Sequence, residues 1–140
     1  MSFDYIVRVK TSCEGGAGTD ADVYVNLIGT QGTSGEYSLD HEGYNDFEKC
    51  DDDTYKITTN EYLGTIEQIH LRVDDRRTND NPAWNLDHIE VNHSSSGQTY
   101  NWIFPVHRWI GNPERNPNVS PDIAASMINN ISIGYDGLIW

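Results

Sequence analysis

Hydrophobic and polar residues alternate in short runs along much of the chain. Tyr5, Val7 and Val9 set the pattern near the start, and similar runs recur up to Phe104. A period of two is typical of β-strands that bury one face, and clusters of Gly, Asn, Asp and Ser separate the runs. The expected strands cover residues 5–10, 23–28, 55–58, 69–73, 84–86, 89–91 and 100–104. The pattern therefore predicts an all-β antiparallel fold, with a β-bulge where the alternation slips between Leu86 and Ile89.

Four turn-rich intervals interrupt the expected strands. They cover residues 12–20, 29–35, 40–53 and 74–83. These intervals are long for hairpins, and long loops on a rigid sheet commonly carry binding residues. We therefore expect the chemistry of this chain in its loops, whereas Ser94 to Gly97 is expected to form a short hairpin turn.

The C-terminal segment has a different character. Ser120, Pro121 and Asp122 are typical of a helix start, and the alternation of Ile131, Ile133 and Tyr135 predicts one further strand. We divide the chain into a sandwich at 1–112 and an extension at 113–140. The extension, with one helix and one strand, packs either on the sandwich or on a partner, and in the second case it would support oligomer formation.

Composition narrows the class of protein. The chain has 140 residues, which fits one domain, and its net charge of −13 argues against a nucleic-acid ligand. No apolar run reaches the roughly 18 residues of a transmembrane helix. No signal peptide is visible in this chain, which leaves a cytoplasmic protein or a mature secreted or peripheral membrane protein as alternatives.

Acidic residues concentrate in the long intervals. Carboxylates next to glycines supply the hard oxygen ligands that calcium prefers, as in residues 15–20 and 45–48. Solvated loop charge is the alternative explanation of the same residues. Zinc fits poorly because no Cys or His pair has ligand spacing. Cys13 and Cys50 flank two of the acidic intervals, and they either form a disulfide or stay as free thiols.

The sequence offers no catalytic constellation. The five histidines are spread along the chain, and we expect those in strands, such as His70 and His88, to be structural. Ser94 to Ser96 lacks the strand-to-helix context of a nucleophile elbow. We therefore expect a protein that is not an enzyme.

Several short motifs, taken in order, resemble the PLAT domain, the β-sandwich module of polycystins, lipoxygenases and bacterial alpha-toxins. The resemblance runs from about residue 4 to residue 111. The motifs that carry it are Tyr5-Ile6-Val7-Arg8-Val9, Ala17-Gly18-Thr19-Asp20-Ala21-Asp22-Val23-Tyr24-Val25, Leu39-Asp40, Tyr44-Asn45-Asp46-Phe47-Glu48, Leu63-Gly64-Thr65-Ile66, Trp84-Asn85-Leu86 and Phe104-Pro105-Val106-His107-Arg108-Trp109.

This resemblance implies an eight-stranded antiparallel β-sandwich that holds calcium between loops at one end. By position, the implied metal-binding residues are Gly16, Gly18, Asp20, Asn45, Asp46, Glu48 and Asp80. Asp80 is the acid nearest to the place where the family has its third contribution, before Trp84. Ala21 stands where some members have a second acid. Trp109 matches a family tryptophan near that end of the sandwich and is the candidate lipid or partner contact.

We therefore expect a non-catalytic module that binds calcium through its end loops and attaches to lipid membranes or to a protein. The alternative is a structural or assembly subunit that uses the sandwich and the C-terminal extension for protein contacts, without a required metal.

Overall fold

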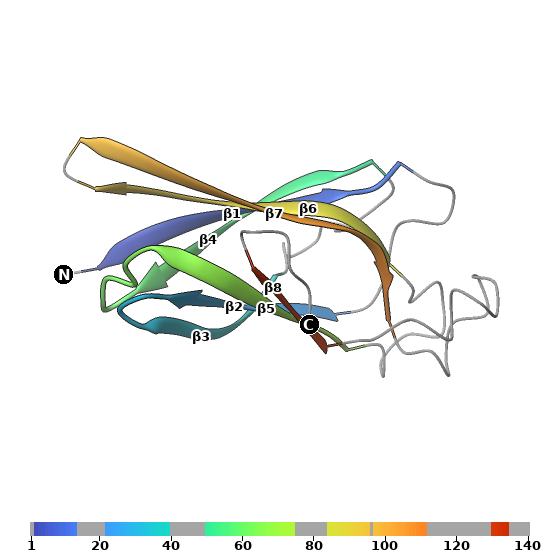
Figure 1. Ribbon diagram of the computed structural model, residues 1–140, viewed down its shortest axis with the longest axis horizontal. Coiled ribbons are helices and arrows are strands. Elements are labelled where there is room, and N and C mark those ends of the chain that lie inside the picture. Colours follow the sequence, from blue (N-terminus) through green and yellow to red (C-terminus); the bar gives the residue numbers. More distant parts are fainter. Residues whose placement is uncertain are drawn as a thin grey trace.

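The chain forms two stacked antiparallel β-sheets in the computed structural model (Figure 1). The structure describes residues 2–13, 22–39, 50–74, 84–95, 97–111 and 130–134, and none of these is helical. The strands are β1 (Phe3–Thr11), β2 (Asp22–Gly29), β3 (Thr33–Ser38), β4 (Asp52–Thr59), β5 (Ile66–Asp74), β6 (Trp84–Ser95), β7 (Gln98–Ile110) and β8 (Asn130–Gly134). The predicted eight-stranded antiparallel sandwich is confirmed.

The first sheet has the strand order β4-β1-β6-β7. Tyr5, Val7 and Val9 of β1 point inward and are fully buried, because every second residue of a strand faces the same side. The bulge that the sequence predicts is present, since the register of β6 against β7 shifts between Leu86 and His88.

The second sheet has the strand order β3-β2-β5-β8. Its edge strand β8 comes from the C-terminal part of the chain and pairs with β5, with Ile131 opposite Leu71 and Ile133 opposite Ile69. All four of these side chains are fully buried, so residues 130–134 complete the core of the sandwich. The helix expected near residue 121 lies outside the described residues.

Between the sheets lies one hydrophobic core. Its largest members include Trp84, Tyr5 and Phe104. The polar atoms of Trp84 and Tyr5 form hydrogen bonds inside the core. The Trp84 indole N–H donates to Thr11 Oγ1 (2.9 Å), and the Tyr5 hydroxyl accepts from the Leu63 backbone N–H (3.0 Å). These bonds fix the orientation of both rings.

Strand β3 differs from the sequence-based expectation. Residues 29–35 were expected to form a long loop, but β2 ends at Gly29 and β3 begins at Thr33, so the connection is a short turn. The strand reads Thr-Ser-Gly-Glu-Tyr-Ser and none of its residues is buried. Because it lies at the sheet edge and contributes little to the core, it carries no hydrophobic period.

The connection between β4 and β5 packs tightly against the β2–β3 turn. Backbone N–H groups of Gln31 and Thr30 donate to the carbonyls of Leu63 and Thr65, both at 2.9 Å. Gly64 lies at the closest point with φ +77°, and a Cβ there would stand 2.2 Å from Thr30 Oγ1. Only glycine combines this backbone angle with this close approach.

Candidate functional site

The seven residues expected to bind metal lie outside the described residues: Gly16, Gly18, Asp20, Asn45, Asp46, Glu48 and Asp80. They fall in three stretches, residues 14–21, 40–49 and 75–83, which we call the acidic segments. The structure describes the residues that border each acidic segment. The site is therefore built here from these borders.

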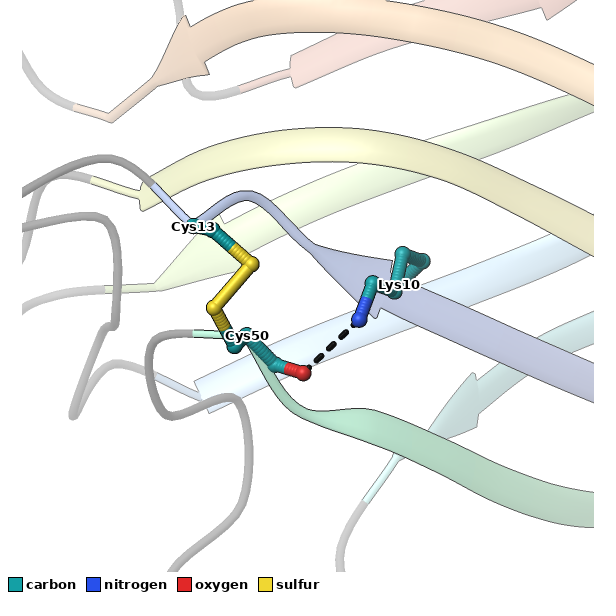
Figure 2. Close-up of a disulfide and its surroundings, with 3 residues drawn as sticks. All are labelled: Lys10, Cys13 and Cys50. Atoms are coloured by element: carbon teal, nitrogen blue, oxygen red, sulfur yellow. Dashed lines mark hydrogen bonds between the residues drawn. A yellow bond between two sulfur atoms is a disulfide. The ribbon is translucent and has the colours of Figure 1, made fainter.

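A disulfide between Cys13 and Cys50 joins the start of the first acidic segment to the end of the second (Figure 2). The two Cα atoms are 4.4 Å apart although 37 positions separate them in the sequence. Around the bond, the Cys50 N–H donates to the Ser12 carbonyl (3.0 Å) and the Lys10 ammonium donates to the Cys50 carbonyl (2.8 Å). Of the two alternatives for the cysteines, the structure has the disulfide.

The opposite borders of these two segments also lie together. The Leu39 N–H, just before the second acidic segment, donates to the carbonyl of Val23, just after the first (2.9 Å). The first and second acidic segments therefore leave and re-enter the sandwich side by side at both of their ends.

The third acidic segment borders the same end of the sandwich. Asp22, which follows the first segment, pairs in register with Asp74, which precedes the third. The Ser12 N–H donates to the carbonyl of Asn85 (3.0 Å), one residue beyond the start of β6. In Figure 1 the ends of β1 and β5 and the starts of β2, β4 and β6 lie at the same side of the molecule. All three acidic segments are thus anchored at one end of the fold.

Basic side chains already neutralise one carboxylate beside the disulfide. Arg8 donates from Nε to Asp52 Oδ1 (2.8 Å), and this hydrogen bond lowers the pKa of Asp52. Asp53, the next residue, is buried with 4% of its surface exposed. Asp52 and Asp53 therefore serve the structure of β4, and the run of acids at 51–53 is not wholly loop charge.

The donor chemistry of the acidic segments suits a hard cation. Carboxylates, an amide and glycine carbonyls supply only oxygen ligands, which calcium prefers. Within the described ranges, no three His, Cys, Asp or Glu side chains come together as a metal site. A ligand set of this kind would therefore need residues outside the described ranges, and the acidic segments are the candidates that the sequence indicates.

Trp109 is the one candidate contact residue that the structure describes. It is half-buried near the end of β7, at the same end of the sandwich as the acidic segments, and pairs in register with Asn85. Its indole is not part of the buried core cluster.

A cluster of His88, Asp87 and His107 was not expected from the sequence. Both imidazoles contact the Asp87 carboxylate through Nδ1, at 2.7 Å for His88 and 2.9 Å for His107. His107 has a left-handed φ of 49°, unusual for a residue other than glycine. The sequence predicted the β-bulge near Asp87, which was the only indication of this cluster. The position of His107 beside Asp87 depends in addition on how β7 pairs with β6, and the sequence alone does not give that pairing.

Sequence comparison identifies relatives of the whole sandwich. The model of the PLAT/LH2 domain matches residues 5–120. The chain is 31% identical over 106 residues to the mouse polycystin family receptor for egg jelly, covering 76% of this chain and 5% of that protein. It is 31% identical over 131 residues to human lipoxygenase homology domain-containing protein 1, covering 94% of this chain and 6% of that protein. The chain thus spans only a small part of each of these relatives.

Structure comparison also finds a solved structure with the same fold. The crystal structure of coral 8R-lipoxygenase, described as showing calcium activation via a C2-like domain, superposes with a TM-score of 0.69 and 26% identity over 94% of this chain and 16% of that chain. The match lies over the two-sheet sandwich described above. The chain therefore belongs to the PLAT/LH2 domain family.

Proposed function

We propose that this chain is a non-catalytic attachment module that binds calcium through its acidic segments and so presents one end of the sandwich to a lipid membrane or a protein partner. Asp20, Asp46 and Glu48 would supply carboxylate ligands, Asn45 an amide oxygen, and Gly16 and Gly18 backbone carbonyls. Asp80 is the proposed ligand from the third segment.

One observation carries the proposal: the disulfide and backbone hydrogen bonds hold the borders of the first two acidic segments together at both ends. Two loops whose ends are already held together lose less conformational entropy when they close around one ion than two independent loops lose. Crowding of like charges at one end also favours a divalent cation, because the cation offsets their repulsion.

The relatives support the coarser part of the proposal. Coral 8R-lipoxygenase is described as activated by calcium through a C2-like domain, and this chain resembles part of that structure. The matched part is 16% of the lipoxygenase chain, so the resemblance supports an accessory module and not the activity of the whole enzyme.

Attachment to lipid would use Trp109. A tryptophan combines a large apolar area with one N–H donor, which suits the boundary between water and lipid. Binding of calcium would neutralise part of the negative charge of this end, which would weaken its repulsion from the anionic leaflet. Vesicle flotation of the wild type and Trp109→Ala, with and without calcium, tests this step.

Thermal unfolding in calcium and in chelator tests the metal. A ligand at 100 times its dissociation constant adds about 2.7 kcal/mol, which raises the Tm of a chain this size by about 9 °C. We expect Asp46→Ala to abolish most of this increase, while its Tm in chelator is unchanged or higher because one crowded anion has been removed.

Glu67→Ala is the matched control, since it removes the same charge from an exposed position on β5. It should keep the full calcium effect. If millimolar calcium does not change the Tm of the wild type, the proposed calcium site is rejected. A large loss of stability for Asp46→Ala in chelator would show instead that Asp46 is a structural hydrogen-bonding residue.

A further inference from the structure

Strand β7 leaves a long edge of the first sheet uncovered within the described part of the chain. It has 13 residues and pairs only with β6 among the described strands. The hairpin of β6 and β7 extends away from the end that bears the acidic segments (Figure 1). An uncovered edge presents a row of backbone donors and acceptors that can pair with another strand.

The other three edge strands carry features that discourage such pairing. β4 bears Asp52 and Lys56 at exposed positions, β3 bears Glu36, and β8 has five residues. Charged side chains and short length are the usual protection of sheet edges. In β7, the stretch Gln98–Phe104 has neither, since it contains no charged residue.

The absence of charge continues along the chain on both sides of this stretch. No Asp, Glu, Lys or Arg occurs anywhere from residue 91 to residue 106, although the whole chain has a net charge of −13. Two copies of so acidic a protein repel each other wherever their charged surfaces meet. The edge of β7 from Gln98 to Phe104 adds no charged side chain of its own, so a second copy can approach this edge with less repulsion.

Apolar side chains make the same stretch suitable for contact. Ile103 is 51% exposed and Tyr100 is 38% exposed, and they are the exposed large hydrophobic residues among those described. The Tyr100 ring stacks on Trp102, with centroids 5.9 Å apart and planes 9° from parallel. Tyr100 and Trp102 lie on one face of β7, and Asn101 and Ile103 lie on the other.

Pro105 indicates which backbone groups of β7 point outward. Proline lacks an N–H, so in an edge strand it is tolerated where that N–H would face away from the sheet. Alternate residues of a strand direct their backbone groups to the same side, so Asn101 and Ile103 share the outward direction of Pro105. The stretch that can pair runs from Gln98, after the turn at Gly97, to Phe104, and its centre is Asn101.

We propose that two copies of this chain associate edge to edge through β7, antiparallel and centred on Asn101. Asn101 then lies opposite its equivalent, and Ile103 lies opposite Thr99 of the second copy. Tyr100 lies opposite Trp102, which forms an aromatic row across the junction. The two first sheets become one continuous sheet, while the acidic segments stay at the far ends.

Sedimentation of the full chain over a dilution series tests the association. We expect a mass of twice 15.8 kDa at high concentration and the single-chain mass on dilution. Ile103→Lys places a charge on the edge, and Asn101→Pro removes an outward N–H that the monomer does not use. Both variants should stay monomeric, whereas Thr65→Lys, at an exposed position away from β7, should dimerise like the wild type.

Amide hydrogen exchange of the wild type gives a second readout that does not depend on the folding of any variant. The Asn101 and Ile103 amides should exchange fast in dilute solution and slowly at high concentration. A wild type that stays monomeric at every concentration would overturn the proposal. Dimer formation by both Ile103→Lys and Asn101→Pro would also overturn it. The same holds for a wild-type dimer in which the Asn101 and Ile103 amides still exchange fast.

Discussion

Replacing Cys13 and Cys50 together by serine removes the covalent bond between the first two acidic segments. The bond closes a loop with a sequence separation of 37 residues. In the chain-entropy model, a loop of this size restricts the unfolded chain by about 13 cal/mol/K, or about 4 kcal/mol at 25 °C. For 140 residues, unfolding entropy is about 0.3 kcal/mol/K, so we expect the Tm to fall by about 13 °C.

Urea unfolding of the wild type and the double-serine variant measures this loss directly. The wild type in a thiol reductant is the matched control, and it should unfold at the same urea concentration as the variant. A loss below about 1 kcal/mol would show that the disulfide does not stabilise the fold by restricting the unfolded chain. It would mean that the unfolded chain already holds these positions together, or that the disulfide opposes the native geometry. That geometry is set by the backbone hydrogen bonds from Cys50 to Ser12 and from Thr11 to Asp51.

Two further predictions concern a glycine in a tight turn and an ion pair. Gly64→Ala should lower the free energy of unfolding by about 3 kcal/mol, because a Cβ there meets Thr30, whereas Gly97→Ala, at a similar φ but in open space, should cost about 1 kcal/mol in the same urea assay. Because Arg8 lowers the pKa of Asp52, their pairing stabilises the fold above the ordinary aspartate pKa of 3.8 and is lost as the pH falls through the lowered value. Arg8→Met should therefore raise the pKa of Asp52 in an NMR titration and flatten the loss of stability in acid; an unchanged pKa would contradict this assignment.

The fold was largely predictable because most strands bury one face. The alternation of Tyr5, Val7 and Val9 and the slip after Leu86 both correspond to observed features, since each inward position is a side chain that fills the core. The polar edge strand at 33–38 was missed because it buries no residue and its pairing with β2 leaves no period in the sequence.

The candidate site was less accessible to sequence reasoning. Which segments lie at one end of a sandwich depends on the pairing of distant strands, and no local pattern encodes that pairing. Cys13 and Cys50 are an example. From their positions in the sequence, a disulfide and two free thiols were equally acceptable, and only the structure shows that the two residues are adjacent. The His88, Asp87 and His107 cluster was missed for the same reason: it forms across two strands, where a bulge changes which residues face each other.

A crystal structure of the protein grown with calcium would show whether the first two acidic segments bind the same ion. We expect a single ion with carboxylate oxygens of both Asp20 and Asp46 at about 2.3–2.6 Å. Carboxylates of these two residues that bind separate ions, or that point apart with no ion between them, would contradict it.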